Sequence, residues 1–150
     1  MRYDGHHKLA TSNIPNDLLE EVEWVEMCPE VFMGLGVPRP PMNLYSTDTH
    51  SLKLLEVVNK SDHTELANKK MYELINMYSN INVWVLKSQS PSCGYQSTPH
   101  YADLNEENYV LGHGLFVNLL IEKSENLKIF DEQIFLNLQN YKTFLKQIAL

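Results

Sequence analysis

The sequence contains little cysteine, and this scarcity limits the chemistry to expect. Only Cys28 and Cys93 occur among the 150 residues. Two cysteines are too few for the disulfide framework of a small secreted domain. We therefore expect a reducing, cytoplasmic setting and no disulfide between the two thiols.

Positive charge is also in short supply, and long apolar runs are absent. Lys and Arg number 12 against 19 Asp and Glu, which gives a net charge of −7. Without a basic cluster, the chain has no general attraction for nucleic-acid phosphates. A single small base is still compatible with this charge, because it carries few charges. No run approaches the roughly 18 apolar residues of a membrane span. Residues 1–8 lack the apolar core of a secretion signal.

Apolar periodicity predicts helices that alternate with strands. We expect strands at residues 22–27, 51–59, 82–87 and 127–130, and helices at 16–21, 63–79, 112–123 and from 131 onward. The prolines and glycines between residues 29 and 41 predict a long irregular loop. This order indicates an α/β fold with a layered, mostly parallel Rossmann-like sheet and flanking helices. The length, with no linker or repeat, fits one domain.

Both cysteines follow predicted strands. The strand at 22–27 leads directly into Cys28, and the strand at 82–87 is followed by Ser90-Pro91-Ser92-Cys93-Gly94. Open α/β sheets keep their sites at the carboxyl ends of their strands. We therefore expect the two sulfurs to lie within about 7 Å of each other at one edge of the sheet.

The two thiols have a structural and a functional interpretation. Free cysteines are most often small buried hydrophobic residues. The prolines and glycines around this pair instead favour turns, whose free N–H groups lower a thiol pKa. Thiolates in such turns suit an iron–sulfur cluster, zinc or copper. Two thiolates alone complete none of the usual closed metal sites.

Polar residues beside the cysteines extend the candidate site. Pro29 fixes the backbone between Cys28 and Glu30, so Glu30 is a candidate general base, with a solvated carboxylate as the alternative. Ser90 is either a turn residue or a further polar group of the site. The six histidines show no metal-site spacing.

A glycine pair stands before the apolar run that ends near residue 123. Gly112-His113-Gly114 either cradles an anion at a helix N-terminus or lets that helix pack closely. The close-packing interpretation is the simpler one, because the pattern is short and occurs once.

Three motifs occur together in the order of one family. They are Arg2-Tyr3-Asp4-Gly5 with His7-Lys8, then Cys28-Pro29-Glu30-Val31 followed by Gly34-Leu35-Gly36-Val37-Pro38-Arg39-Pro40-Pro41, then Leu86-Lys87 with Ser90-Pro91-Ser92-Cys93-Gly94. Through this series the chain resembles the thiouracil desulfidase-like family over almost its whole length.

The resemblance implies an iron–sulfur-dependent desulfidase that removes sulfur from thiolated nucleobases such as thiouracil. In that family three cysteines bind a 4Fe–4S cluster, whose open iron takes the thiocarbonyl sulfur. Carried over by motif, the metal ligands are Cys28 and Cys93, the catalytic residues are Glu30 and Ser90, and the substrate-binding residues are Asp4, His7, Arg39 and Ser92.

The chain departs from the family at its start. Family members carry an apolar strand and a first cysteine just before the Arg-Tyr-Asp-Gly motif, whereas Met1 directly precedes Arg2 here. Residues 1–150 are thus expected to form a single desulfidase-like domain, N-terminally truncated relative to the family, without the third cysteine ligand. His6, His7 and Asp4 are the nearby donors. Unpaired strand edges would favour a homo-oligomer.

Two other functions compete with the desulfidase. One is a degenerate, non-catalytic relic that binds a small molecule without a cluster. The other is a thiol-redox or zinc protein that uses Cys28 and Cys93.

Overall fold

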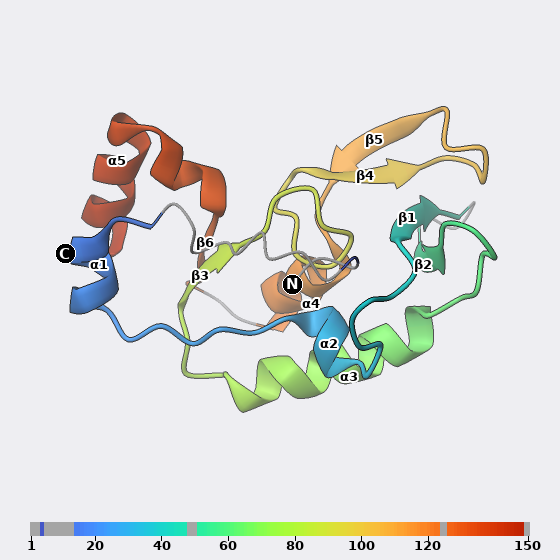
Figure 1. Cartoon of the computed structure of the whole chain (residues 1–150), viewed down its shortest axis with the longest axis horizontal. Coiled ribbons are helices and arrows are strands. Elements are labelled where there is room, and N and C mark those ends of the chain that lie inside the picture. The colour runs from blue at the N-terminus through green and yellow to red at the C-terminus, as the bar shows by residue number, and fades with distance from the viewer. Residues whose placement is uncertain (1–3, 5–13, 48–50, 124–125, 149–150) are drawn as a thin grey trace.

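The protein has a mixed α/β fold, seen in a computed structural model that describes residue 4 and residues 14–47, 51–123 and 126–148 (Figure 1). The helices are α1 (Asn16–Glu21), α2 (Pro29–Phe32), α3 (Thr64–Met77), α4 (Leu115–Lys123) and α5 (Leu138–Ile148), with a 3₁₀ helix η2 (Glu132–Leu136). The strands are β1 (Met42–Ser46), β2 (Leu52–Glu56), β3 (Val83–Leu86), β4 (Thr98–Tyr101), β5 (Tyr109–Gly112) and β6 (Lys128–Asp131). None of these helices has the length and apolar character needed to cross a membrane.

The strands form two sheets of different character. The larger sheet has the order β2-β1-β4-β5, in which only the β1–β4 pair is parallel. The smaller sheet is the parallel pair β3–β6. An α/β fold is confirmed, but a mostly parallel Rossmann-like sheet is not, because β1–β2 and β4–β5 are consecutive strands joined by short connections, which make antiparallel pairs.

Several predicted elements are confirmed with adjusted ends. α1, α3, α4 and the strands β2, β3 and β6 lie where periodicity placed them. The strand expected at 22–27 is wrong, because that segment is extended but pairs with no described strand. The loop expected at 29–41 contains the short helix α2. Asp131 caps η2 through Gln133 N–H, and a second cap at Asn137 starts α5.

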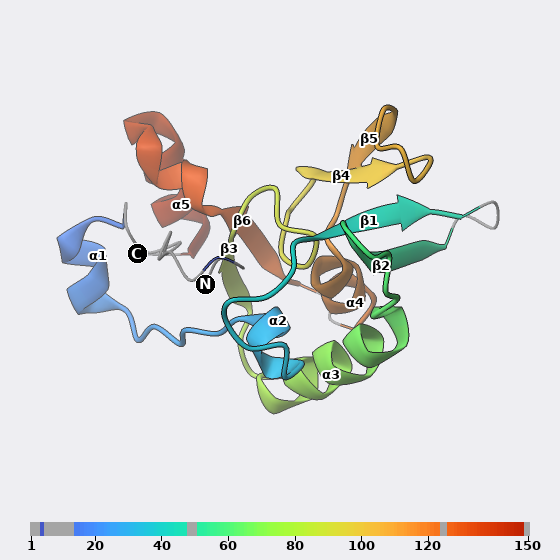
Figure 2. The ribbon, with the colours of Figure 1, turned by 45° about the vertical axis from the view of Figure 1, so that its right-hand side comes forward.

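The small parallel sheet separates two apolar clusters (Figure 2). Trp84 and Leu86 of β3 pack into the major core, which also contains buried side chains of α3 and α4. Val85 of β3 and Phe130 of β6 contact the minor core, built around Leu18 of α1 and Phe144 of α5. Adjacent strand residues point to opposite faces, so the same four-residue strand serves both clusters.

The helices that form the major core follow from simple sequence rules. On α3, Ala67, Met71 and Leu74 lie on one face and are buried, as the spacing of four and three residues requires. Asp62 accepts a hydrogen bond from Thr64 N–H at 2.9 Å and satisfies one of the free donors at the helix start. This helix packs against α4.

Candidate functional site

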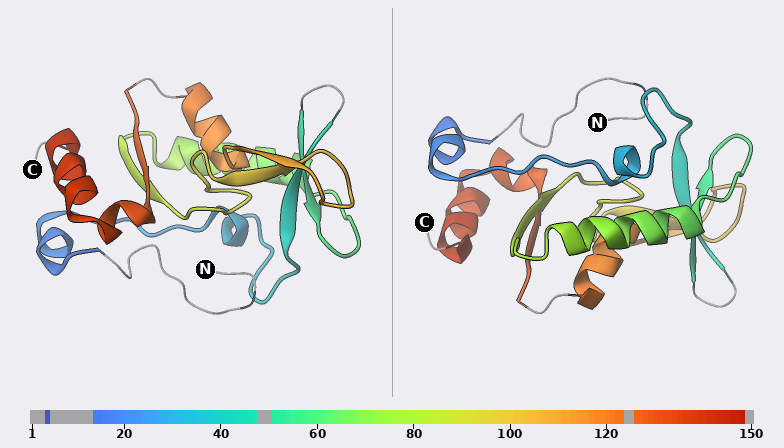
Figure 3. Two further views of the ribbon diagram at one scale, coloured as in Figure 1. Left: turned by 90° about the horizontal axis from the view of Figure 1, so that it is seen from above. Right: turned by 90° about the horizontal axis from the view of Figure 1, so that it is seen from below.

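The candidate site is a groove of about 1430 Å³ between residues 22–28 and β3. Figure 3 shows the segment of residues 22–28 running from α1 to α2 past β3. Its lining includes five of the candidate residues from the sequence motifs, namely Cys28, Glu30, Arg39, Ser90 and Cys93. The structure therefore brings both thiols to one groove, although they are 65 positions apart in the sequence.

Cys28 lies immediately before the short helix α2. Its backbone is extended, and its carbonyl accepts a hydrogen bond from Phe32 N–H at 3.0 Å. Pro29 occupies the first helical position, where its missing N–H costs nothing. The helix start therefore turns the chain sharply and places Glu30 on the first turn beside Cys28.

Cys93 lies in a tight loop organised by Ser90. The Ser90 hydroxyl accepts hydrogen bonds from Ser92 N–H at 3.2 Å and from Cys93 N–H at 3.0 Å. The Ser90 carbonyl accepts from Gly94 N–H at 3.0 Å and from the Thr98 hydroxyl at 2.7 Å. These bonds show Ser90 as a turn residue whose hydroxyl also stands next to the Cys93 thiol.

The N-terminal end of α4 closes the Cys93 loop from behind. The N–H groups of Gly114, Leu115 and Phe116 donate to the carbonyls of Gly94, Pro91 and Ser92 at 2.7, 2.9 and 3.0 Å. A Cβ atom on Gly114 would lie 2.3 Å from the Ser92 carbonyl oxygen. The close-packing interpretation of Gly112-His113-Gly114 is therefore confirmed, and these amides bind loop carbonyls instead of an anion.

Glu30 links the two cysteine segments. Its carboxylate accepts from Arg39 through Nε at 3.0 Å and through Nη2, and from the Ser92 hydroxyl at 2.9 Å. All three residues are buried. Arg39 also donates to the Gly36 carbonyl at 3.0 Å. The ion pair joins α2 to the loop that follows it, and the Ser92 hydrogen bond joins both to the Cys93 loop.

The electrostatic environment of Cys93 disfavours its thiolate. Burial raises the pKa of the Cys93 thiol most, and the negative charges of Glu30 and Cys28 raise it further. A hydrogen bond with Ser90 acts in the opposite direction and is too weak to compensate. Both cysteines are free thiols. A bound cation would reverse this preference, because a metal stabilises the thiolate.

The described residues supply part of a metal site. Soft thiolates suit an iron–sulfur cluster, and the two cysteines that could supply them line this groove. Within residue 4 and residues 14–47, 51–123 and 126–148, no three His, Cys, Asp or Glu side chains form a group that could hold a metal ion. The described donors therefore fit the chemistry of a cluster but do not complete a site for one.

The substrate-binding residues implied by the motifs fall into three groups. Arg39 and Ser92 are buried and bonded to Glu30. Asp4 is half-buried and takes part in interactions of its own. His7, like His6, lies outside the described residues. The structure thus brings Arg39 and Ser92 to the groove as partners of Glu30.

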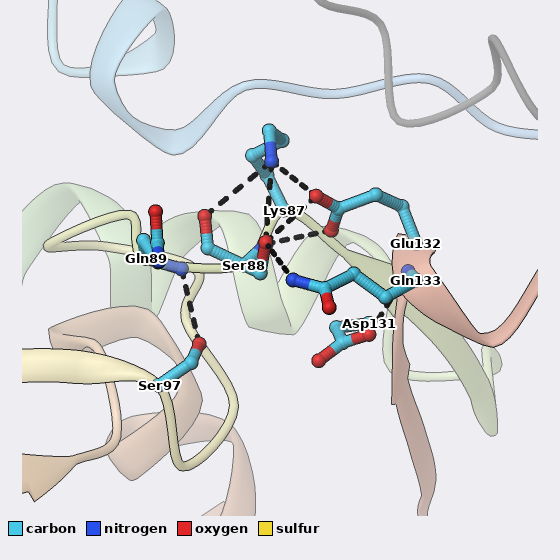
Figure 4. A network of polar contacts seen from close by, with 7 residues as sticks. All are labelled: Lys87, Ser88, Gln89, Ser97, Asp131, Glu132 and Gln133. Carbon is cyan, nitrogen blue, oxygen red and sulfur yellow. Dashed lines mark hydrogen bonds and ion pairs between the residues drawn. The ribbon is translucent and has the colours of Figure 1, made fainter. Parts of the chain in front are cut away.

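Sequence reasoning missed a polar network at the end of β3, shown in Figure 4. Lys87 forms an ion pair with the buried Glu132, which also accepts from Ser88 N–H at 2.6 Å and from the Ser88 hydroxyl at 2.8 Å. Burial alone would raise the pKa of Glu132, but the bonds from Lys87 and Ser88 outweigh it and hold that pKa below its usual value.

The network fixes the start of the loop that carries Cys93. It joins the carboxyl ends of the parallel strands β3 and β6, because Lys87 and Glu132 each follow the last residue of their strand by one position. The available sequence signal was that a charged residue directly follows each of these two short strands.

Three comparisons with known proteins bear on the groove. A model of the 2-thiouracil desulfurase family matches residues 1–132. A solved structure of a [4Fe-4S]-dependent thiouracil desulfidase, TudS (DUF523Vcz), is 27% identical with a TM-score of 0.68, over 95% of this chain and 89% of that chain. A search of curated proteins finds no match.

Proposed function

The chain belongs to the 2-thiouracil desulfurase family, and on that basis we propose that it removes sulfur from thiolated nucleobases such as thiouracil. In the proposed reaction, water replaces sulfur on the base carbon: the carbon–sulfur bond breaks, a carbon–oxygen bond forms, and sulfur leaves as sulfide. The observation that carries the proposal is the groove in which both cysteines and a buried glutamate meet.

The cofactor that we propose is a 4Fe–4S cluster with Cys28 and Cys93 among its ligands. Such a cluster supplies an open iron that can bind a thiocarbonyl sulfur. The remaining ligands must come from outside the described donors, because two thiols do not complete the site. His6 and His7, which with Asp4 are the donors near the start of the sequence, are the candidates.

Glu30 is the acid–base group of the proposal. Three glutamates line the groove, and of Glu23, Glu26 and Glu30 only Glu30 is buried. Arg39 and Ser92 fix the direction of its two carboxylate oxygens. A carboxylate held in this way can take a proton from a water that attacks the base. Arg39 and Ser92 then act as positioning residues.

Ser90, Asp4 and His7 complete the proposed substrate environment. The Ser90 hydroxyl already accepts two backbone hydrogen bonds and can donate its own proton toward the groove. We assign it to substrate positioning or proton relay, beside Cys93. Asp4 and His7 are proposed to line or brace the base on the motif resemblance.

The partner that we propose is a small thiolated base and no nucleic acid. The net charge of −7 disfavours a polyanion, whereas a neutral base meets no such barrier. A cytoplasmic setting is part of the proposal, since both thiols are free. The relic without a cluster is not favoured, because family and structural neighbour are desulfidases.

The proposal is tested by anaerobic reconstitution with iron and sulfide, followed by measurement of sulfide release from thiouracil. We expect Glu30→Gln to keep bound iron and to lose at least 100-fold in turnover, since a positioned acid–base group contributes about 10²–10⁴-fold. The matched control is Glu26→Gln, which changes an exposed glutamate of the same groove. Native turnover in Glu30→Gln would contradict the assigned role.

A further inference from the structure

The two edges of the four-stranded sheet differ in how their backbone groups are satisfied. Along the β2 edge, the segment that follows the strand returns and bonds to it. Glu56 N–H donates to the Ser61 carbonyl at 3.0 Å. The Leu54 carbonyl accepts from His63 N–H at 2.9 Å. Lys53 adds a charge on the same strand. Cover and charge of this kind keep an edge from pairing with another chain.

The opposite edge, formed by β5, has a different character. In the order β2-β1-β4-β5, β5 pairs with β4 alone among the described strands. Figure 1 and Figure 2 show it at the periphery of the molecule, with β4 on its inner side. Its sequence, Tyr109-Val110-Leu111-Gly112, contains no charge and no proline. An edge without these features pairs readily with another strand.

The hydrogen-bond pattern of β4 and β5 identifies the free backbone groups. Ala102 N–H donates to the Asn108 carbonyl at 2.9 Å, and two positions further along the register the same kind of pair includes Val110. Hydrogen-bonded pairs alternate with pairs that are not bonded along an antiparallel ladder. Val110 therefore turns its N–H and C=O toward β4, whereas Tyr109 and Leu111 turn theirs to the free edge.

The side chains of β5 are apolar and exposed on both faces of the sheet. Tyr109 and Leu111 lie on one face and are 55% and 61% exposed. Val110 lies on the other face and is 68% exposed. A strand of an antiparallel sheet usually buries the apolar residues of one face. The β5 edge therefore offers both backbone groups and apolar contact area to a partner.

We propose that β5 pairs in antiparallel orientation with β5 of a second copy of the chain, so that two sheets become one. The two-fold axis of such a dimer stands perpendicular to the sheet and passes beside the same residue of each strand. With the axis at Val110, Tyr109 lies opposite Leu111 of the second copy, and the two copies of Val110 face each other. This register uses every free N–H and C=O of Tyr109 and Leu111 in both chains.

The sequence around β5 favours this register over its neighbours. With the axis at Tyr109, Leu111 would lie opposite Glu107 of the second copy, which sets an apolar side chain against a carboxylate. With the axis at Leu111, Tyr109 would lie opposite His113, beyond the end of the strand. The register centred on Val110 instead sets apolar side chains opposite apolar side chains, which stabilises a pair of strands.

Complementary groups at the two ends of the paired strands favour a second copy as the occupant. In the register centred on Val110, Glu107 lies opposite His113 of the second copy, once at each end. His113 Nδ1 accepts a hydrogen bond from Gln96 N–H at 3.2 Å, so the neutral ring carries its proton on Nε2. A carboxylate opposite this ring can accept a hydrogen bond from Nε2–H. An unrelated strand would have to supply both the apolar run and the acidic flank.

The dimer is expected to be weak and reversible. β5 has four residues, whereas stable interfaces bury about 1,200 Å² or more and involve about 20 residues on each side. We therefore expect a Kd in the micromolar range. Each chain carries a net charge of −7, so the two copies repel at low salt, and the Kd should fall as salt is added.

The test is sedimentation velocity of the metal-free chain, from micromolar to millimolar concentration, at near-physiological salt. We expect a concentration-dependent species of twice the monomer mass. Val110→Lys sets two like charges across the axis and should raise the Kd at least tenfold. Val58→Lys is the matched control, because it makes the same charge change at a residue that is 82% exposed and lies outside the sheet. It should leave the Kd unchanged.

A second variant tests the backbone bonds. Leu111→Pro removes an N–H that faces the free edge and that β4 does not use, so the β4–β5 pair keeps its own hydrogen bonds. We expect association at least tenfold weaker than that of the wild type. Leu111→Thr keeps both the N–H and a residue suited to strands, and should weaken association less than Leu111→Pro. The difference between the two variants isolates the hydrogen bond from the side chain.

Cysteine cross-linking measures the register. Opposite residues of an antiparallel pair without hydrogen bonds have Cα atoms about 4.5 Å apart, within the range of a disulfide. In oxidised glutathione, Val110→Cys should therefore form an intermolecular disulfide at least tenfold faster than Tyr109→Cys or Leu111→Cys. Two protein thiols lose their protons and are oxidised to one disulfide, while glutathione disulfide is reduced to two thiols. Peptide mass mapping distinguishes this disulfide from any that involves Cys28 or Cys93.

The outcomes separate clearly. A dimer that Val110→Lys and Leu111→Pro weaken and that Val58→Lys does not weaken supports the proposal. A chain that stays monomeric over the whole concentration range, or a dimer that all three variants leave unchanged, overturns it. Faster cross-linking through residue 109 or 111 overturns the register. The chain holds no iron in any of these measurements, so a failure of the proposed desulfidase function leaves their interpretation unchanged.

Discussion

The two cysteine segments of the groove are held in opposite ways. The Cys93 segment, residues 88–94, is fixed by its own serine and by three amides of α4. The Cys28 segment, residues 22–32, is extended up to α2 and has Glu30 as its buried polar tie to the rest of the groove. One thiol is therefore held by its local fold, and the other by the long-range hydrogen bond between Glu30 and Ser92. The geometry of the pair depends on the weaker segment.

Among the variants that test this comparison, the one that removes the Glu30–Arg39 ion pair should lose the most unfolding free energy. Arg39→Met leaves the Glu30 charge buried without its cation, which typically costs about 3–5 kcal/mol of unfolding free energy. Replacing both members, with Glu30→Leu added, should recover most of that loss. Urea titration measures both. The control is Lys70→Met, which breaks the more exposed pair with Glu73 and should cost less than about 1 kcal/mol. Equal losses in Arg39→Met and Lys70→Met would contradict the assignment.

A smaller loss of unfolding free energy is expected from a substitution that crowds the Cys93 segment. Gly114→Ala introduces a methyl group 2.3 Å from the Ser92 carbonyl oxygen, so α4 must move away from the Cys93 loop. We expect a loss of about 2–3 kcal/mol by the same titration. Gly36→Asn, in the loop after α2, is the control, because its Cβ meets no atom within 4 Å and Asn tolerates a positive φ. If the two variants unfold at the same urea concentration, the close contact is not a constraint.

The reactivity of Cys93 tests whether its tightly held segment keeps the thiol protonated. Burial and the charges of Glu30 and Cys28 raise the Cys93 pKa, so its thiol stays protonated at neutral pH. In the Cys28→Ser variant, iodoacetamide at pH 7.5 should alkylate Cys93 at least tenfold more slowly than it alkylates free cysteine. This ratio corresponds to a free-energy difference of about 1.4 kcal/mol between thiol and thiolate. Denaturation in urea should restore the normal rate. Rapid alkylation of the folded variant would show that the thiolate is not disfavoured.

The smallest expected effect is the loss at low pH of the stability that Glu132 contributes at the start of the Cys93 loop. The pKa of Glu132 is lowered in the folded protein, mainly by bonds from Lys87 and Ser88 that outweigh burial. A lowered pKa stabilises the fold above the unfolded-state pKa, and this contribution disappears as pH falls through the folded-state value. The stability difference between wild type and Glu132→Gln should therefore be present at pH 7 and shrink below about pH 4.5. A difference that stays constant down to pH 3 would contradict this account.

Local signals predicted the helices other than α2, and the strands β2, β3 and β6. α3 and α4 carry apolar side chains at helical spacing, and β3 is a short apolar run, so periodicity located them. β1, β4 and β5 were missed because each is only four or five residues long, and Thr98–Tyr101 contains a proline and a histidine. Their pairing depends on contacts between segments distant in sequence.

The sequence predicted which residues form the site better than it predicted which of them contact one another. Sequence motifs singled out Cys28, Glu30, Ser90 and Cys93, and the groove collects all four. The contacts of Glu30 with Arg39 and Ser92 span 9 and 62 positions, and no local pattern reveals them. The prediction of a strand at residues 22–27 was wrong for a related reason. A strand must pair with another strand, and this extended segment has no such partner among the described residues.

The position of the small sheet between two clusters has a consequence for how the molecule opens. Among the described residues, the minor core contains three buried side chains, Ile14, Leu18 and Phe144, whereas the major core contains many more. Cooperative units with little buried apolar surface open at lower free energy than the whole fold. Amides of α1 and α5 should therefore exchange with deuterated water well before those of α3 and α4. A protease would find its first cleavage sites around residues 22–27, whose release leaves the larger unit folded.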